Sequence, residues 1–259
     1  MKLEYTIVIP SYKREKIIQE KTLQTLQNYS IPPSQIHIFV ANKEEYKKYK
    51  EQLNKDFYGK LIIGVPEIAK QRNFIRNYYP EGEKLLMMDD DIEDIEIKKG
   101  SKLVKIKNLN QLINRGFQLL KKEHCKMLGV YPVHNAYFMK NEIVKGLYFI
   151  VGCMYWCINS HDPRLYVKLP TKDDYELSLK EYLTNGSVLR LNNITIKTKY
   201  YSNEGGVTDF RTNQMIKKCS DYLINKYPQY VALKTIRDGK HEIKFLKQKN
   251  NIKIICRGG

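Results

Sequence analysis

The sequence contains no hydrophobic run long enough to span a bilayer. Its longest nearly apolar stretch, residues 146–158, has 13 residues, whereas a transmembrane helix needs about 20. The apolar stretch at the N-terminus is interrupted by Glu4 and ends at Pro10, which argues against a signal peptide. We therefore expect a protein without a membrane span.

Cysteines are few, and their number is odd. The five cysteines show no paired spacing, a usage that fits a reducing cytosol better than a disulfide framework. Cys153 and Cys157 lie four residues apart in the most apolar segment, and a zinc site needs more ligands than these two. We expect a cytoplasmic protein in which both cysteines pack in the core.

Acidic residues are outnumbered: 45 Lys and Arg stand against 28 Asp and Glu, for a net charge of +17. The excess lies in two blocks, residues 98–145 and 211–259, which carry +9 each, while the rest of the chain is close to neutral. Concentrated basic blocks indicate contact with a polyanion such as nucleic acid. The alternative is solvated surface charge, since the chain is rich in Lys, Asn, Ile and Tyr together, a bias that AT-rich coding produces.

The length of 259 residues is close to the size at which one hydrophobic core stops growing, roughly 250–300 residues. Through residue 88, short apolar runs alternate with amphipathic stretches, the pattern of βαβ units on a parallel sheet. Strands are predicted over residues 5–9, 36–40, 61–65 and 85–88, and helices over 15–29, 44–54 and 68–78.

Beyond residue 100 the alternation changes, and we expect a mixed sheet. The predicted elements are a helix over 109–122, strands over 127–132 and 147–158, a helix over 173–184 with Gly186 as its C-cap, and a helix ending at Lys226. Asn192-Asn193 predicts a hairpin between 188–191 and 194–201, because Asn tolerates positive φ. A second hairpin is predicted around residues 249–251. The fold class is α/β.

Three consecutive aspartates, Asp89, Asp90 and Asp91, directly follow the predicted strand 85–88. Ligands of open α/β sheets bind at the carboxyl ends of the strands, and three carboxylates there repel one another unless a cation neutralises them. Carboxylate ligation favours a hard ion such as Mg²⁺ or Mn²⁺. A haloacid-type phosphatase would need a small residue where Glu93 stands. A polymerase palm, which needs a further carboxylate on an adjacent strand, remains open.

The segment from Thr6 to Arg14 reads Thr-Ile-Val-Ile-Pro-Ser-Tyr-Lys-Arg and resembles the first strand and nucleotide loop of GT-A glycosyltransferases. Three later segments resemble that family in the same order: Val40-Ala41-Asn42, Lys70-Gln71-Arg72-Asn73 and Met88-Asp89-Asp90-Asp91-Ile92. The resemblance implies a GT-A fold, with a Rossmann-like nucleotide-binding half and a mixed sheet. It also implies Mn²⁺ or Mg²⁺ as cofactor and a nucleotide sugar, by family expectation a UDP-sugar, as donor.

The resemblance assigns roles to particular residues. It implies that Asp89 and Asp91 hold the metal, that Asp90 meets the ribose or sugar hydroxyls, and that Tyr12 stacks on the base. Arg14, Lys70 and Arg72 are expected at the diphosphate, with an ordinary surface cation as the alternative for Arg14 and Lys70. No third protein ligand for the metal is evident. The expected donor-binding set is Pro10, Ser11, Tyr12, Arg14, Asn42, Lys70, Arg72, Asp89 and Asp90.

Two further segments extend the resemblance. Lys172-Asp173-Asp174-Tyr175-Glu176-Leu177 is similar to the element that carries the catalytic base of inverting members, which implies that Asp174 is the base. For Asp173 we expect N-terminal capping of the helix that follows. Residues 205–211, which begin Gly-Gly-Val and end at Arg211, resemble the glycine loop that closes over the donor.

Within GT-A enzymes the chain most resembles the dioxygenase-associated glycosyltransferases, the group of base-J glucosyltransferase and its phage relatives. This implies an acceptor in double-stranded DNA, 5-hydroxymethylcytosine or 5-hydroxymethyluracil, and a bacterial host cell if the gene is phage-borne. We expect a GT-A domain over 1–210, divided into a nucleotide-sugar half (1–98) and an acceptor half (99–210), and a basic helix and hairpin over 211–259.

Two other interpretations remain. The same fold acting on a cell-surface or lipid-linked glycan is one, and a non-catalytic basic nucleic-acid-binding protein is the other, although the second leaves the three aspartates unexplained. The aromatic side chains Tyr148, Tyr155 and Trp156 either stack on a base or, as such residues more often do, belong to the core.

Overall fold

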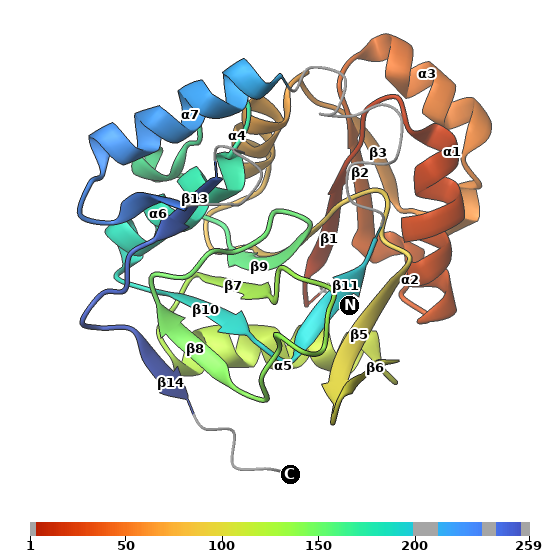
Figure 1. Cartoon of the computed structure of the whole chain (residues 1–259). Helices are drawn as coiled ribbons and strands as arrows, with labels where there is room; N and C mark the ends of the chain where they lie inside the picture. The colour runs from red at the N-terminus through yellow and green to blue at the C-terminus, as the bar shows by residue number, and fades with distance from the viewer. Residues whose placement is uncertain (1–3, 199–211, 235–241, 255–259) are drawn as a thin grey trace.

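The computed structural model describes residues 4–198, 212–234 and 242–254. The first half alternates strands and helices as the sequence predicts (Figure 1). Its elements are β1 (Thr6–Pro10), α1 (Glu15–Ile18), the π-helical turn η1 (Gln19–Leu23), α2 (Gln24–Asn28), β2 (Ile36–Val40), α3 (Lys43–Gln52), β3 (Lys60–Ile63), α4 (Ile68–Tyr78) and β4 (Lys84–Met88), with short 3₁₀ turns η2 (Pro33–Gln35) and η3 (Lys55–Phe57).

The second half is more varied. Its elements are β5 (Asp94–Lys99), β6 (Lys102–Lys105), α5 (Leu109–Lys122), β7 (Met127–Val130), β8 (Ile143–Gly146), β9 (Met154–Ile158), η4 (Pro163–Leu165), α6 (Asp173–Asn185), β10 (Val188–Leu191), β11 (Ile194–Lys197), α7 (Asn213–Lys226), β12 (Val231–Lys234), β13 (Glu242–Phe245) and β14 (Ile252–Ile254). No helix among the described residues is long and apolar enough to cross a membrane.

A nine-stranded mixed sheet forms the centre, in the order β14-β8-β10-β7-β9-β4-β1-β2-β3. Strands β1 to β4 are parallel to one another, whereas β9 runs antiparallel to both β4 and β7. Strand β9 thus joins two parallel groups, and β7, β10 and β4 all end at the same edge of the sheet. The predicted α/β class with a mixed second half is confirmed.

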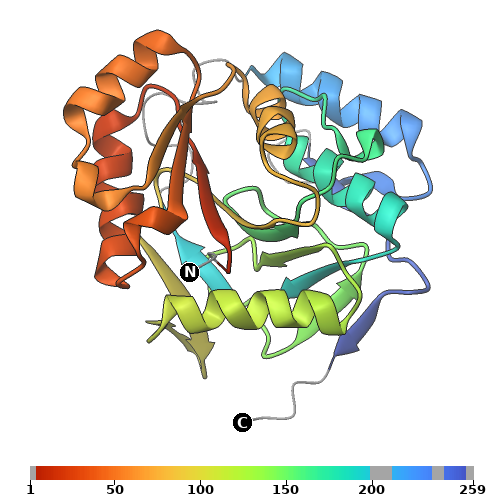
Figure 2. The same ribbon diagram turned by 180° about the vertical axis from the view of Figure 1, so that it is seen from behind.

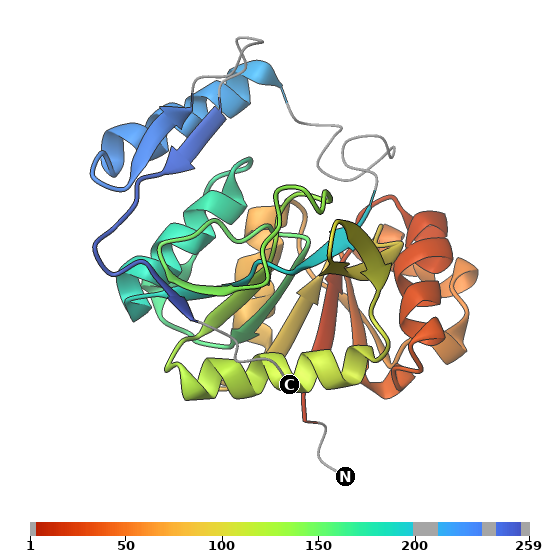
Figure 3. The ribbon, with the colours of Figure 1, turned by 60° about the horizontal axis from the view of Figure 1, so that its bottom comes forward.

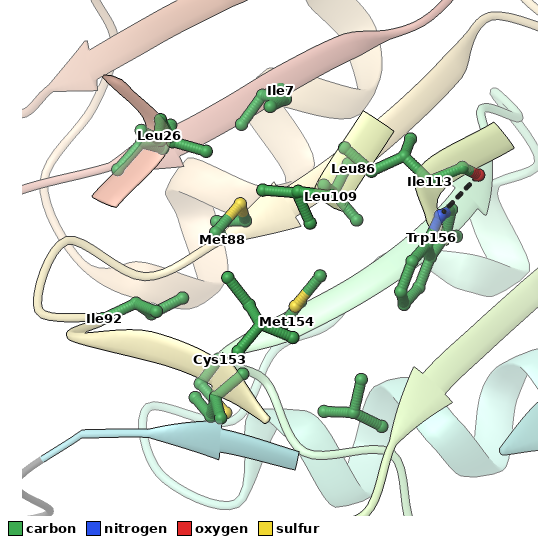
Figure 4. Packing of buried hydrophobic residues seen from close by; sticks show 14 of the residues in the cluster. Ile7, Leu26, Leu86, Met88, Ile92, Leu109, Ile113, Cys153, Met154 and Trp156 are labelled. Carbon is green, nitrogen blue, oxygen red and sulfur yellow. Dashed lines mark hydrogen bonds between the residues drawn. The ribbon is translucent and has the colours of Figure 1, made fainter. Parts of the chain in front are cut away.

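Alternate side chains of the central strands pack on opposite faces of the sheet. One face, which carries Ile7, Leu86 and Trp156, is covered by α1, α2, α3 and α5; Figure 2 shows α5 lying across it, and Figure 4 shows its packing. The Trp156 indole is fully buried and donates to the Ile113 carbonyl at 3.0 Å. The other face, with Tyr155, is covered by α4 and α6. The core interpretation of both aromatic residues is confirmed.

The described C-terminal segment packs on the outer side of α6. Leu179 of α6, Leu223 of α7 and Ile243 of β13 belong to a third apolar cluster, and Figure 3 shows α7 and the β12–β13 pair as a layer beside α6. The chain then returns to the central sheet, where β14 pairs antiparallel with β8. Cys153 and Cys157 are both buried among apolar side chains, which confirms their expected core packing.

Three predictions of local structure are wrong. β10 and β11 do not form a hairpin at Asn192-Asn193, because β11 leaves the central sheet and pairs with β5 in a three-stranded sheet. β13 pairs with β12, and β14 with β8, so residues 249–251 do not connect two paired strands. The predicted strand 147–158 begins only at Met154; before it, the Ile150 amide donates to Ser178 Oγ of α6 instead of to a neighbouring strand.

Candidate active site

The loops that follow β1, β2, β3 and β4 meet at one edge of the sheet, because these strands are parallel. Asp89, Asp90 and Asp91 follow β4 directly. The strand itself is apolar and fully buried from Leu85 to Met88. Its packing in the core therefore fixes the position of the three aspartates that follow it. The Asp89 amide donates to the Cys153 carbonyl at 2.9 Å, which ties the start of the triplet to the neighbouring segment.

Asp90 is held by residues from the loop after β1. Ser11 Oγ donates to one carboxylate oxygen at 2.6 Å, and Arg14 Nη1 donates to the other at 3.0 Å. Burial raises the pKa of Asp90, while Arg14 and the Ser11 hydrogen bond oppose that rise. For Arg14, burial opposes the charged form, but the aspartates outweigh it and raise the pKa of the guanidinium. The two loops are therefore joined by a nearly buried ion pair.

Asp89 and Asp91, which precede and follow Asp90 in the chain, make contacts of their own. Thr198 Oγ1 donates to Asp91 Oδ1 at 3.0 Å, and Arg14 Nη1 lies 3.5 Å from Asp91 Oδ2. Thr22 Oγ1 donates to the Asp89 carbonyl at 2.8 Å and accepts from the Ile92 amide at 2.9 Å. Burial and the neighbouring charge of Asp91 raise the pKa of Asp89 well above its usual value. These hydrogen bonds fix the backbone of the triplet, while the negative charges of Asp89 and Asp91 repel each other.

The chemistry of this donor set fits a hard divalent cation. Carboxylate oxygens are the ligands that Mg²⁺ and Mn²⁺ take, and a nearby cation would offset the burial and repulsion that disfavour the Asp89 carboxylate. Among residues 4–198, 212–234 and 242–254, no three His, Cys, Asp or Glu side chains converge as a complete metal site. Asp89 and Asp91 would hold the ion, with water and substrate oxygens completing its shell.

A second charged group lies beside Asp89, at the contact of α4 with α6. Arg72 Nε donates to Asp173 Oδ2 at 2.9 Å, and Nη1 donates to the Tyr155 hydroxyl at 2.7 Å. Burial would lower the pKa of Arg72, but Tyr155 and the carboxylates of Asp173, Asp89 and Asp174 raise it. The N-cap of α6 is Lys172, with φ of 61°, so the expected capping role of Asp173 is wrong: its carboxylate pairs with Arg72.

Asp174 lies next to this ion pair, in the first turn of α6. One oxygen accepts from the Tyr175 amide at 2.9 Å, and the side chain is partly exposed. Gly152 approaches closely from the segment before β9: a Cβ at that position would lie 2.6 Å from Arg72 Nη2 and 3.5 Å from Asp174 Cβ. Arg72, Gly152 and Asp174 are therefore in contact range, and the charge of Arg72 also acts on Asp89.

We expect Gly152→Ala to destabilise the protein by about 1–3 kcal/mol, the usual cost of overpacking. The new methyl group would meet a guanidinium that three acceptors already fix, including the Gly152 carbonyl at 3.4 Å. Urea unfolding measures the effect. In an Arg72→Lys background, where Nη2 is absent, the same substitution should cost clearly less; an equal cost in both backgrounds would contradict this explanation.

The other predicted donor-binding residues lie at the same edge of the sheet, and each makes contacts of its own. Pro10 ends β1 opposite Phe39, and the Tyr12 ring, partly buried, lies 5.1 Å from Lys13 Nζ. The Asn42 side chain accepts from two backbone amides as the N-cap of α3. Lys70 is exposed and pairs with Glu67 at 2.7 Å. The predicted glycine loop, residues 205–211, lies outside the described residues.

Several residues at the site are not predicted from the sequence. Tyr49 of α3 hydrogen-bonds Ser11 and accepts from the Arg14 amide at 3.0 Å, so it shapes the loop after β1. Thr22 and Thr198 are isolated threonines whose contacts with the triplet arise only through folding. Gly152 could have been predicted, since a glycine inside an apolar stretch often marks a position where another part of the protein comes close to the backbone.

No protein-family model matches this sequence, and no curated protein sequence matches it. Solved structures do match. S. aureus TarS 1–349 aligns with a TM-score of 0.51 and 17% identity over 86% of this chain, and a form of it in complex with UDP aligns with a TM-score of 0.50. The mannosyltransferase PcManGT from Pyrobaculum calidifontis, in complex with GDP-Man and Mn²⁺, aligns with a TM-score of 0.53 and 13% identity over 92% of this chain.

The chain covers 66% of the length of TarS 1–349 and 66% of the mannosyltransferase. Identities this low establish a shared architecture. The mixed sheet, the parallel strands β1 to β4 and these two neighbours together confirm the expected fold: this chain has the GT-A fold of nucleotide-sugar glycosyltransferases.

Proposed function

We propose that this protein is a metal-dependent, inverting glycosyltransferase that moves a sugar from a UDP-sugar to 5-hydroxymethylcytosine or 5-hydroxymethyluracil in DNA. One observation carries the catalytic part of this proposal. The carboxylates of Asp89 to Asp91 emerge at the end of β4, between the Arg14 loop on one side and Asp174 with Arg72 on the other. The solved neighbours with bound UDP, or with GDP-Man and Mn²⁺, support a nucleotide-sugar donor and a divalent metal.

The donor side is formed by the loops after β1 and β4. When bound, Mn²⁺ or Mg²⁺ supplies Lewis-acid stabilisation of the charge that builds on the departing diphosphate. Asp89 and Asp91 would hold it, and Asp90, fixed by Ser11 and Arg14, would meet the ribose or sugar hydroxyls. Tyr12 stacks on the base, with Pro10 and Asn42 beside it. Arg14, Lys70 and Arg72 provide positive charge toward the phosphates.

The acceptor side is formed around Asp174. Its carboxylate is partly exposed and accepts the proton of the attacking hydroxyl, a general-base contribution of typically 10²–10⁴-fold. Attack from the side of Asp174, opposite the diphosphate, inverts the anomeric carbon. Arg72 bonds Asp173, the residue before Asp174, and thereby holds the first turn of α6 in place. Residues 1–98 thus serve the donor and residues 99–210 the acceptor, with 211–259 as a basic extension.

The charge of the chain supports a DNA acceptor. The net charge of +17 lies mainly in residues 98–145 and 211–259, and phosphate contacts by such blocks attach a protein to DNA without reading its sequence. Exposed lysines of the first block include Lys99, Lys102 and Lys105 on the β5–β6 pair.

Nucleoside mass spectrometry tests the proposal. The purified protein is incubated with Mn²⁺, a panel of UDP-sugars, and DNA that contains hydroxymethylcytosine or hydroxymethyluracil. We expect one nucleoside to gain the mass of one sugar. Hydrolysis of a UDP-sugar without any mass gain on DNA would refute the DNA acceptor and direct the search to glycans. No hydrolysis of any donor would refute the enzyme itself.

A further inference from the structure

Arg190 is a cation in the acceptor half that the proposed reaction does not use. It lies near the end of β10, and its neighbours Val188 and Leu189 pack on opposite faces of the sheet, so Arg190 faces the α4–α6 side like Val188. Across the sheet it is in register with Gly129 of β7, which in turn faces Tyr155 of β9. Two strand spacings of about 4.8 Å place Arg190 roughly 10 Å from Tyr155.

The guanidinium of Arg190 is enclosed by aromatic rings. Its Cζ lies 5.4 Å from the centroid of the Tyr131 ring and 5.2 Å from that of Tyr148. Nε donates to Asn192 Oδ1 at 2.8 Å, and Nη1 donates to the Phe149 carbonyl at 3.1 Å. Among the residues that the structure describes, Nη2 has no hydrogen-bond partner. Both acceptors are neutral, so neither hydrogen bond brings a negative charge to the guanidinium.

Other largely buried arginines of the described chain each pair with a carboxylate. Arg14 lies 3.0 Å from Asp90, Arg72 lies 2.9 Å from Asp173, and Arg76 lies 3.4 Å from Glu181. Arg190 makes no ion pair with any described residue. The charge of Glu142 does act on it, but that carboxylate already accepts from Asn192 and pairs with Lys253 at 3.1 Å.

An unpaired cation in such a place is costly. Burial lowers the pKa of Arg190, a sign that its charged form is poorly compensated. Buried charges are normally paired, because desolvation of a lone ion is expensive. The residue remains partly exposed, so the guanidinium is open to an anion from outside, which would supply the charged partner that the described residues do not provide.

We propose that Arg190, with Tyr131 and Tyr148, forms an anion-binding site that takes a phosphate group of the acceptor. Phosphate fits because the planar guanidinium offers parallel N–H donors to two oxygens, and the tyrosine hydroxyls offer further donors. The site adjoins Asp174 through its neighbour Tyr175, whose ring stacks on Phe149 at 4.1 Å. Assignment of the phosphate to a DNA acceptor rests on the proposed function; the binding of an anion at Arg190 does not.

Calorimetric titration tests the site directly. Sodium phosphate is titrated into the full chain without divalent cations, so that the carboxylates of Asp89 to Asp91 repel anions from the donor side. We expect Arg190→Met to weaken phosphate binding roughly 10- to 100-fold, the loss typical of charge-assisted hydrogen bonds. Arg190→Lys keeps the charge but loses the planar donor pair, so its affinity for phosphate should lie between those of the wild type and Arg190→Met. Arg164→Met removes an exposed arginine that pairs with Asp162, and serves as the matched control.

Binding to Arg190→Met within twofold of the wild type, or an equal loss in Arg164→Met, would overturn the site. Circular dichroism checks that each variant is folded, and Arg190→Lys carries the test should Arg190→Met unfold. A second titration compares tetrathymidylate with glycerol 3-phosphate. Preference for the oligonucleotide, lost in Arg190→Met, supports a nucleic-acid phosphate; equal binding of both assigns the site to phosphate groups in general and overturns its DNA assignment. Neither titration requires sugar transfer, so failure of the enzyme proposal and failure of this site are distinguishable.

Discussion

Replacement of Asp91 by alanine is expected to lower the rate of UDP-sugar turnover by about 10³-fold, equivalent to about 4 kcal/mol of transition-state stabilisation. The reason is the loss of one of the two carboxylates that we propose to hold the metal against the leaving diphosphate. The fold should tolerate the change, because removal of Asp91 also relieves its repulsion of Asp89, a main cause of the raised pKa of that residue. Chromatography of released UDP at saturating Mn²⁺ measures the rate.

Glu93→Gln is the matched control for Asp91. Glu93 is an acid two residues further along the same loop, and its carboxylate lies 3.3 Å from Lys21 Nζ rather than at the triplet. This variant should retain turnover within about twofold, because loss of a partly exposed ion pair away from the triplet has a small effect. Full activity in Asp91→Ala, or equal losses in both variants, would show that the triplet does not hold the metal.

Asp174→Asn should slow sugar transfer by 10²- to 10⁴-fold, the range for loss of a general base. Asparagine preserves the size of the side chain and can still accept the hydrogen bond from the Tyr175 amide, so the first turn of α6 should be unchanged. Affinity for UDP, measured by calorimetry with Mn²⁺, should stay near the wild-type value. Single-turnover transfer assays separate the chemical step from binding.

For the neighbouring carboxylate, Asp173, we expect a loss of folding stability instead. Asp173 pairs with Arg72 at a contact where both side chains are about nine-tenths buried, and removal of one partner from such a pair costs on the order of 3 kcal/mol of folding stability. Asp173→Ala should therefore lower the unfolding midpoint clearly, whereas Asp174→Asn should not. If Asp174→Asn unfolds as easily as Asp173→Ala, its loss of activity reports stability rather than base catalysis.

Local sequence predicts most of this fold and fails where pairing is remote. The helix over 109–122 is found as predicted, because Asn108 caps it and Leu109, Ile113 and Leu120 repeat on one face. The composition of Asn192-Asn193 predicts a hairpin. In the structure, Asn192 instead bonds Arg190 and Glu142, and the strand after it joins β5. A turn signal shows where the chain bends and says nothing of which strand it meets next.

The candidate site likewise contains residues that local sequence predicts and residues that only the packed structure brings together. Asp89 to Asp91 are contiguous and end a buried apolar strand, so their position follows from sequence alone. The pairing of Arg72 with Asp173 joins residues far apart in the chain and needs α4 and α6 to lie side by side. Arg190 is a single cation in a strand, with no motif around it. Its significance depends on the absence of a carboxylate among the described neighbours, which only the packed structure reveals.

The pairing of β14 with β8 bears on how the chain acquires its structure. β8 is complete at residue 146, yet its outer partner comes from residues 252–254. During synthesis, the edge of β8 remains open until residues 252–254 have been made, and an open edge is a site for wrong association between chains. Contacts of such high sequence separation also slow folding. The parallel strands β1 to β4 can assemble early, whereas the opposite side of the sheet must wait for β14.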